Sequence, residues 1–372
     1  MTHRDTPPYR IAVWSTGAIG SIVIRHVLTR SGHDLVAVWV HDEAKRGRDV
    51  GDLLGLPTTG VTTTSAVEDV VAAAPDCVIY ASASPELDAA YLPHYVELLG
   101  AGIDVITVST PGLMFPPGFD ARSVARLSAA ARSGGATLYA SGMEPGFAGD
   151  QLVALLTTLS GTVSSIRTQE IFRYDEYANE FLMRDVFGFG MALDETPLMQ
   201  LGGSQLMAWG PPVEYVAAAL GVTLDGIRET YERLPTPRDL DVAMGRIAAG
   251  TAGAVRMETI GVVDGEDLIV IEHVNRMAPD LAPEWPDADR DGTYRIVITG
   301  EPNLTCELTL GHDPAEATEH GLIGTAMRLL NAVPHVVRAA PGLVSSLDLP
   351  LTVPQLGTEA GVASRARGPI GV

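Results

Sequence analysis

The chain has 372 residues, of which 46% are hydrophobic and 19% are charged, so it is long enough to bury two domain cores. Its formal net charge of -21 excludes a general nucleic-acid or anionic-membrane partner, because most of the surface would repel it. No segment has the roughly 18 uninterrupted apolar residues of a membrane helix, and the N-terminal residues lack the apolar region of a secretory signal. We therefore expect a soluble, cytoplasmic protein of two domains.

The chain contains two cysteines and nine histidines. Cys77 and Cys306 lie far apart in apolar, strand-like runs, so we expect them to be reduced core thiols, as in cytoplasmic proteins. The histidines are scattered, with none in an H-x-x-x-H pattern or beside a cysteine pair, and no G-x-S-x-G motif occurs. The sequence therefore predicts neither a metal site nor a serine nucleophile.

Residues 10–142 alternate β-branched runs with Ala- and Leu-rich stretches, which is the pattern of βαβ units and a parallel sheet. The predicted strands cover 10–14, 35–40, 76–81, 103–108 and 136–140. The predicted helices between them cover 18–30, 65–74, 85–101 and 118–133. This part of the chain is typical of an α/β fold.

The pattern of predicted elements changes after "SGMEPG". One helix is predicted at about 148–160, and alternating segments follow at 163–174, 252–263, 267–277, 293–300 and 303–310. The hairpin-like stretches "VVDGED" and "TGEPN" favour a largely antiparallel sheet. Residues 181–250 read as helical and loop-rich, with "GPP" and "LPTPRD" as breaks, and a last helix near 316–331 ends at "NAVPHV".

The stretch "WSTGAIG" follows the first predicted strand and opens the first predicted helix. Gly17 and Gly20 keep the spacing x-G-x-x-G, whereas Ser15 stands where the first glycine of G-x-G-x-x-G would be. Backbone amides at such a helix start bind a pyrophosphate, so we predict a dinucleotide site. Its residues are Ser15, Thr16, Gly17, Ala18, Ile19 and Gly20. The alternative is an ordinary strand-to-helix turn with two glycines.

The second predicted strand is followed by "HDEAKRGR". An NAD site usually has an acid at this strand end, but His41 occupies the place and Asp42 comes one residue later. Lys45, the only lysine of the chain, and Arg46 follow, and cationic groups suit a 2′-phosphate. We therefore expect NADP, with NAD possible. The alternative is a solvated surface loop.

Several blocks resemble the dihydrodipicolinate reductase-like oxidoreductases of actinobacteria, which are related to 2,4-diaminopentanoate dehydrogenase and the native amine dehydrogenases. The blocks are "YRIAVWSTGAIG", "LVAVWVHDEAKRGRDVGDLLG", "SGMEPGF" and "GTAMRLLNAVPHVVRAAPGLVSSLDLP". The resemblance implies a homodimer that binds NAD(P). It also implies an N-terminal Rossmann domain with a parallel sheet (1–146), an α+β substrate and dimerisation domain with a mixed, largely antiparallel sheet (147–315), and a C-terminal segment that returns to the Rossmann domain (316–372). The predicted cofactor-binding residues also include Ala81, Ser82, Ser109 and Asn331.

The sequence departs from both named relatives. Dihydrodipicolinate reductase proper carries a paired-histidine and lysine signature, whereas the only lysine here is Lys45. Native amine dehydrogenases place a catalytic glutamate after the fifth strand, in a stretch resembling "STCEELSYP". This chain reads "STPGLMFPP", with Pro111 and Gly112 at those positions. We therefore expect the usual general base to be missing from this place.

Three residues are candidates for proton transfer. Glu144 lies in "SGMEPGF" after the last strand of the first domain, at the sheet edge where ligands bind, and burial would raise its pKa. The alternative is that it caps a helix. Tyr174 lies in "RTQEIFRYDEY", where alternation sends Glu170, Phe172 and Tyr174 to one face that could line a pocket or lie under a dimer partner.

His335 is the third candidate, with Asn331 on the other side of the "AVP" turn. A lone histidine is more often structural, and an asparagine near a helix C-terminus is more often a cap.

The combined features predict an NAD(P)H-dependent oxidoreductase that reduces a C=O or C=N bond of a small substrate. The stretch "FLMRDVFGFGMALD" is rich in Phe, Met and Leu, which would line a pocket for a largely apolar substrate. The alternative is that these residues belong to the hydrophobic core. One alternative is an NADP(H)-binding sensor or regulatory homodimer without turnover. Another is a homodimeric scaffold with a vestigial cofactor site.

Overall fold

The structure is a computed structural model that describes residues 8–84 and 88–354. The chain divides into two compact units. Unit 1 contains Met1–Gly142 and Leu322–Val372, and unit 2 contains Met143–Gly321.

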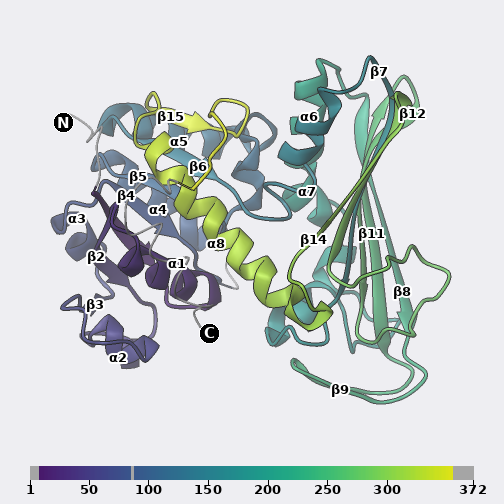
Figure 1. The fold of residues 1–372 in the computed structure, drawn as a ribbon, viewed down its shortest axis with the longest axis horizontal. Helices are drawn as coiled ribbons and strands as arrows, with labels where there is room; N and C mark the ends of the chain where they lie inside the picture. The colour runs from purple at the N-terminus through teal and green to yellow at the C-terminus, as the bar shows by residue number, and fades with distance from the viewer. Residues whose placement is uncertain (1–7, 85–87, 355–372) are drawn as a thin grey trace. The chain divides into compact units, whose positions relative to one another are not determined.

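Unit 1 is built on a seven-stranded sheet in which every pair of neighbouring strands is parallel, in the order β15-β6-β5-β4-β1-β2-β3 (Figure 1). Its strands are β1 (Tyr9–Trp14), β2 (His33–Trp39), β3 (Thr63–Thr64), β4 (Cys77–Tyr80), β5 (Asp104–Thr107), β6 (Thr137–Ala140) and β15 (Gly342–Val344). Its helices are α1 (Ala18–Thr29), α2 (Val50–Leu54), α3 (Val67–Ala72), α4 (Asp88–Gly100) and α5 (Ala121–Gly134). The predicted Rossmann-type parallel sheet is confirmed.

The central strands of unit 1 are buried on both faces, which is why they read as continuous apolar runs. One core contains Val23, Ile24 and Val27 of α1, together with residues of α8 (Ala317–Val336) such as Leu329 and Val333. The other core packs α4 and α5 against the sheet. Most of α8, from Leu322 on, and β15 thus belong to unit 1, while residues 355–372 of the predicted C-terminal segment lie outside the described residues.

Unit 2 is built on a six-stranded sheet in the order β14-β13-β7-β12-β11-β8. Only β7 and β12 pair in parallel, so the predicted largely antiparallel sheet is confirmed. The strands are β7 (Thr162–Arg173), β8 (Gly226–Pro235), β11 (Ala252–Val263), β12 (Glu266–Arg276), β13 (Thr293–Glu301) and β14 (Leu304–Thr309). Helix α7 (Ser204–Leu220) packs on one face of this sheet, which we call the inner face. Helix α6 (Gln151–Thr157) packs on α7.

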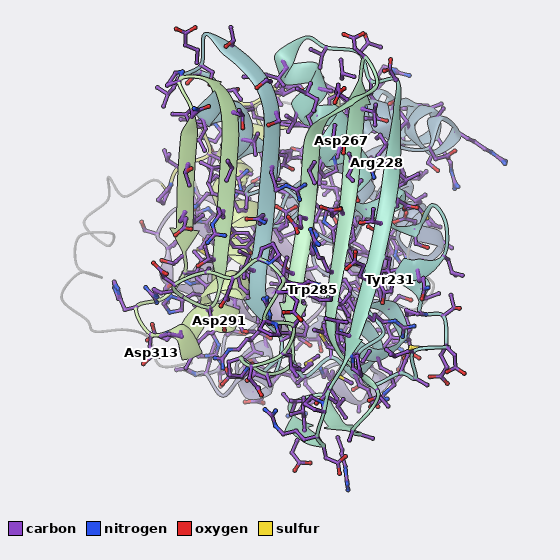
Figure 2. All side chains as sticks on the ribbon, turned by 90° about the vertical axis from the view of Figure 1, so that its right-hand side faces the viewer. Arg228, Tyr231, Asp267, Trp285, Asp291 and Asp313 are labelled. Carbon is purple, nitrogen blue, oxygen red and sulfur yellow. The ribbon has the colours of Figure 1, made fainter. Side chains whose placement is uncertain are left out.

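The opposite, outer face of this sheet carries charged side chains in ion pairs. Figure 2 shows this face, with Arg228 of β8 near Asp267 of β12, which it pairs with. At the centre, the fully buried Glu272 accepts hydrogen bonds from Arg167 at 2.6 Å and Arg256 at 2.7 Å. The alternation of these strands therefore puts polar groups outside and apolar groups under α7.

Three details of the prediction for unit 2 were wrong. Residues 226–235 form β8, and 240–247 contain a short hairpin of β9 (Leu240–Val242) and β10 (Gly245–Ile247). The edge strand β8 is polar on most positions, so it lacked the apolar alternation that marks a strand. The expected break at "GPP" falls inside α7, where packing holds Pro211 and Pro212 in the buried core. Cys306 is only half-buried, because it lies on the edge strand β14.

Half-buried His33, at the start of β2, makes the stability of unit 1 depend on pH. Both ring nitrogens are buried without a hydrogen-bond partner. Burial, followed by the nearby Arg30 charge, lowers the pKa of His33 from 6.5 to about 4. Because the unfolded chain then binds more protons between these values, the free energy of unfolding decreases as pH falls through this window.

We expect wild-type protein to lose about 2 kcal/mol of stability from this group between about pH 7 and about pH 4.5, allowing for the partial exposure of the ring. His33→Phe should remove this part of the pH dependence, measured by urea unfolding at both pH values. His41→Phe, at an exposed histidine of the same unit, is the matched control. Equal pH dependence in His33→Phe and wild type would contradict the assignment.

Candidate active site and cofactor-binding turn

The chain makes a tight turn between β1 and α1. Ser15 adopts a left-handed backbone conformation with φ 92, its amide donates to the Trp39 carbonyl at 2.8 Å, and its Oγ accepts from the Gly17 amide at 3.2 Å. A Cβ on Gly20 would lie 2.0 Å from the Ser15 carbonyl oxygen, so only glycine allows this close approach. Ser15 therefore makes the turn itself, with its own hydroxyl and positive φ, in place of a glycine.

The helix end that follows fits a pyrophosphate. No side chain caps the N-terminus of α1, and Gly17 and Ala18 are exposed there. A Cβ on Gly17 would meet only Ser15 Oγ, at 3.5 Å, so the space in front of the helix is open to a ligand. Uncapped amides and the positive end of the helix dipole together attract an anion.

The predicted basic residues after β2 divide into two groups. Lys45 Nζ donates to Thr16 Oγ1 at 3.3 Å, so this lysine lies at the turn. Arg46 instead pairs with Glu43 at 3.6 Å on the exposed surface, and His41 is also exposed. Asp42 caps the short 3-10 helix η1 (Glu43–Lys45) by accepting from the Ala44 amide at 2.9 Å.

Ala81, Ser82 and Ser109 lie at the carboxyl ends of β4 and β5, on the same sheet edge as the turn. The Ala81 amide donates to the Trp14 carbonyl at 3.1 Å, and Ser109 Oγ donates to the Ser82 carbonyl at 2.6 Å. The segment beyond Thr110 forms a buried 3-10 helix, η2 (Pro111–Met114), which carries no acidic side chain.

Asn331 and His335 are not brought to the turn. Asn331 Oδ1 accepts from Arg30 at 2.7 Å, and Arg30 caps the C-terminal end of α1, opposite Gly17. Asn331 is not a helix cap either, because α8 continues to Val336. His335 lines a cavity of about 440 Å³ with Arg338 and Leu343. The segment after α8 leads into β15, whose first residue, Gly342, donates its amide to the Ala136 carbonyl. This hydrogen bond lies at the amino ends of β15 and β6, whereas the turn lies at the carboxyl end of β1.

Glu144, in unit 2, has a buried carboxylate. Neither oxygen has a hydrogen-bond partner of ordinary geometry, although the Gly149 backbone lies directly against them. Burial raises the pKa of Glu144 well above its usual value, and the charges of Asp150 and Glu170 raise it further, against a smaller opposing effect of the Gly149 amide. Asp150 caps α6 and also accepts from the Gly146 amide at 2.9 Å, so the N-cap of this helix is Asp150 and not Glu144.

Glu170 is the second buried carboxylate of unit 2, with a side chain that is 6% exposed. The Tyr174 hydroxyl donates to its Oε1, and Asn275 Nδ2 donates to the same atom at 3.4 Å. Burial raises the pKa of Glu170 to about 7, although these two hydrogen bonds act in the opposite direction. Burial also raises the pKa of Tyr174 well above its usual value, so this hydroxyl stays a donor at neutral pH.

The strand register places Glu170 in one row across the inner face of the sheet. Its neighbours in the row are His273 of β12 and Tyr294 of β13. His273 packs against Trp209 with ring centroids 4.4 Å apart, and burial lowers its pKa to about 3, so it is neutral. Sequence reasoning missed His273, Asn275 and Tyr294. The signal was there, since "IEHVNR" places polar residues in an otherwise buried strand.

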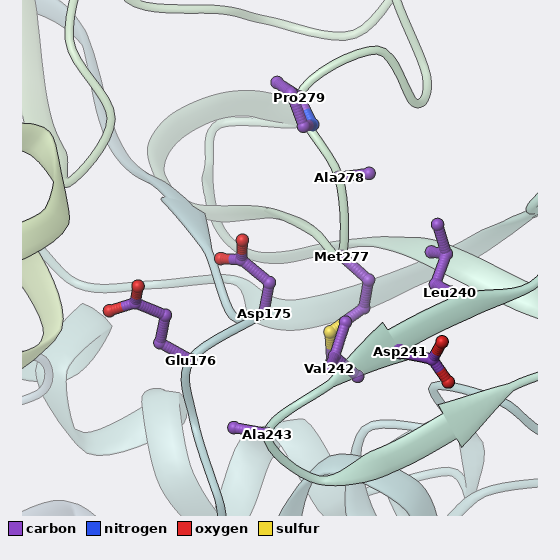
Figure 3. A pocket seen from close by; sticks show the side chains of 9 residues that line it. All are labelled: Asp175, Glu176, Leu240, Asp241, Val242, Ala243, Met277, Ala278 and Pro279. Atoms are coloured by element: carbon purple, nitrogen blue, oxygen red, sulfur yellow. The ribbon is translucent and has the colours of Figure 1, made fainter.

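Unit 2 contains a cavity of about 400 Å³ (Figure 3). Some of its lining residues directly follow members of this cluster in the sequence. Its lining includes Asp175, which follows Tyr174, and Met277, which follows Asn275 and Arg276. Glu176 and Asp241 add two more carboxylates, while Arg173 lies 3.8 Å from Asp175. The lining of the cavity therefore combines three carboxylates with apolar side chains such as that of Met277.

Two sequence families match the chain. The model described as "Dihydrodipicolinate reductase, N-terminus" matches residues 9–139, and "2,4-diaminopentanoate dehydrogenase C-terminal domain" matches residues 147–363. An amine dehydrogenase of Streptomyces virginiae is 39% identical over 355 residues, covering 91% of this chain and 95% of that protein. A 2,4-diaminopentanoate dehydrogenase of Acetoanaerobium sticklandii is 24% identical, covering 92% and 93%.

The fold is also found in a solved structure. The amine dehydrogenase from Mycobacterium smegmatis superimposes with a TM-score of 0.77 at 22% identity, covering 93% of this chain and 97% of that one. The fold and the matching families define an oxidoreductase that uses a nicotinamide dinucleotide. The chain belongs to the family of 2,4-diaminopentanoate and amine dehydrogenases, as the resemblance in its motifs predicted. Within residues 8–84 and 88–354, no helix is long and apolar enough to cross a membrane.

Proposed function

We propose that this protein interconverts a small carbonyl compound and its amine through the C=N bond, with Glu144 and Glu170 as the acid–base groups. The observation that carries the proposal is a pair of buried carboxyls whose pKa values are both raised. Such pairs are frequent at catalytic sites, where a proton must move near neutral pH. The names of the relatives favour C=N over C=O chemistry, and reduction of a C=O bond is the second outcome to test.

No cation of unit 2 neutralises the pair. Among the described residues, Arg173 is held by Asp291 at 2.9 Å, and Arg276 is held by the carbonyl oxygen of Leu281 at 2.9 Å. A positively charged amine or iminium nitrogen would supply the missing charge. The carboxylates of Asp175, Glu176 and Asp241, which line the cavity, favour the approach of the same kind of substrate.

Glu170 is arranged to transfer a proton. Tyr174 and Asn275 both donate to Oε1, whereas Oε2 has no hydrogen bond with the described part of the chain. With a pKa of about 7, the carboxyl can give a proton to a departing oxygen or take one from a nitrogen. The nicotinamide, when bound, accepts or supplies the hydride. Tyr174 serves in this scheme as a donor that holds Glu170.

We also propose that the cofactor is NADP, with NAD accepted less well. The support is Lys45, whose ammonium group contacts Thr16 at the pyrophosphate-binding turn. The Asp42 carboxylate accepts a hydrogen bond from the Ala44 amide as a helix cap. We therefore propose that Lys45, and not Asp42, contacts the cofactor on this side of the site. The protein is further proposed to act as a cytoplasmic homodimer, with the ion-pair face of the unit 2 sheet as the surface available for a second copy.

The activity is tested by following nicotinamide absorbance with a panel of ketones, aldehydes and cyclic imines, each with and without ammonium. We expect turnover of carbonyl compounds only when ammonium is present. Equal turnover without ammonium would favour carbonyl reduction. Tight NADPH binding without turnover of any compound in the panel would favour the alternative of an NADP(H) sensor. If NADPH did not bind at all, the prediction of a dinucleotide site would be wrong.

Glu170→Gln should lower kcat by about 10²–10⁴ with little change in KM, because the proton-transfer group is lost. In wild type, the rate of reduction should fall as pH rises through about 7, since the acid form is consumed, and the rate of amine oxidation should fall as pH drops through the same value. In the variant, neither rate should show this change near pH 7, which is the limb of each pH–rate profile that we assign to Glu170. Glu232→Gln, at an exposed site on β8 of the same sheet, is the control. Retention of the limb in Glu170→Gln would exclude Glu170 as the acid.

Lys45→Ala should weaken NADPH binding about tenfold while changing NADH binding by less than about twofold, because the two cofactors differ only in the 2′-phosphate. Fluorescence titration of the two reduced cofactors measures both constants. Arg122→Ala, at an exposed arginine of α5, controls for the change in net charge. A parallel loss of both affinities in Lys45→Ala would contradict the NADP preference.

A further inference from the structure

Unit 1 contains a cavity that belongs neither to the pyrophosphate-binding turn nor to the carboxyls of unit 2. It has a volume of about 440 Å³ and is lined by the end of α8, the edge strand β15 and residues 348–350. In the sheet order, β6, β5 and β4 separate β15 from β1. Four strand spacings amount to about 19 Å, so this cavity is remote from the turn that follows β1.

Two basic side chains line this cavity, and neither has a partner. In the described part of the chain, the His335 ring and the Arg338 guanidinium make no hydrogen bond and no ion pair. Burial, followed by the nearby charge of Arg338, lowers the pKa of His335, so its ring is neutral at pH 7. A neutral imidazole still carries one N–H donor, and a guanidinium carries five. The lining therefore holds one positive charge and several unused N–H donors.

Asp348 also lines the cavity, but its carboxylate has other partners. Its Oδ2 accepts from the Ser345 amide at 2.8 Å and from Ser345 Oγ at 2.9 Å. This carboxylate holds the turn after β15 and forms no ion pair with Arg338. The charge of Arg338 is therefore left for a ligand.

The rest of the lining is apolar. It consists of Ala339, Ala340, Leu343, Val344, Leu349 and Pro350. Leu343, Val344 and Leu349 are half-buried, so a hydrocarbon chain placed against them would leave water together with their exposed surface. Pockets for small molecules commonly have volumes of about 300–1,000 Å³, and this cavity is within that range.

We propose that this cavity is a second ligand site, which binds a small carboxylate with an apolar chain. Arg338 holds the carboxylate, because the guanidinium fork matches its two oxygens, and His335 donates one further hydrogen bond. A single positive charge suits a monoanion. Because the chain has a net charge of -21, an anion needs such a local cation in order to bind. The inference depends neither on the cofactor nor on the proposed reaction.

Calorimetry of the full chain with hexanoate tests the proposal at about pH 7.5, where carboxylates are ionised. We expect hexanoate to bind and Arg338→Gln to weaken this binding about tenfold, because the ion pair is lost. Hexan-1-ol keeps the chain without the charge, and acetate keeps the charge without the chain. Each should bind at least about tenfold more weakly than hexanoate.

Two variants serve as controls for this measurement. Arg122→Gln, at an exposed arginine of α5, makes the same change in net charge away from the cavity. Lys45→Ala removes the cation at the pyrophosphate-binding turn. Both should leave the affinity for hexanoate within about twofold of wild type, since charges at a distance are screened by salt.

His335 gives a second readout in the unmodified protein. A carboxylate bound beside the ring favours its protonated form, so saturating hexanoate should raise the pKa of His335. Nitrogen-15 NMR of the imidazole groups measures this pKa, and the loss of one signal in His335→Gln assigns it. This readout decides the question if Arg338→Gln does not fold, which circular dichroism shows.

Equal affinities of wild type and Arg338→Gln for hexanoate would overturn the proposal. So would the absence of binding to wild type, equally tight binding of hexan-1-ol, or an unchanged pKa of His335 at saturation. A loss of affinity in Lys45→Ala without a loss in Arg338→Gln would place the carboxylate at the turn and would overturn the proposal as well.

Discussion

Glu170 is buried without a neighbouring cation in the described part of the chain, and the chemistry proposed for unit 2 depends on this burial. Holding this carboxyl at a pKa of about 7 means that its ionised form costs roughly 3 kcal/mol at alkaline pH, relative to an exposed glutamate. The hydrogen bonds from Tyr174 and Asn275 offset only part of the desolvation. The pKa of the nearby Glu144 is also raised by burial, so ionisation of this second carboxyl is unfavourable as well. Structures retain such a cost mainly where a ligand or a reaction uses it.

In unit 1, the proposed cofactor site has to attract phosphate groups to a strongly acidic chain. We propose that backbone groups and a single lysine do this. The left-handed Ser15 and the close packing of Gly20 aim the end of α1 outward, and Lys45 lies beside it. Because all strands are parallel, the ends of β4 and β5 meet the same edge, where Ser82 and Ser109 lie. Local geometry thus compensates for a net charge of -21.

Much of the fold followed from the sequence, because parallel strands buried on both faces and long alternating strands give strong patterns. The turn at 15–20 and the Glu170–Tyr174 face were also predictable, since both depend on spacing along one element. Strand β8 was not, because an edge strand with mostly polar residues lacks that pattern. His273 and Tyr294 lie beside Glu170 only through the register of neighbouring strands, and the hydrogen bond of Asn331 joins it to Arg30, 301 residues away. Such contacts depend on pairing that a single sequence does not encode locally.

With a pKa of about 7, one buried glutamate of this enzyme changes protonation near neutral pH. Carbon-13 NMR of protein labelled at the glutamate side-chain carboxyl carbons tests it without cofactor or substrate. We expect a carboxyl resonance that titrates with a pKa of about 7 in wild type and is missing in Glu170→Gln. If all glutamate resonances instead titrate in the ordinary range near 4 to 5, or if the signal near 7 persists in the variant, Glu170 is not the acid–base group and the account fails.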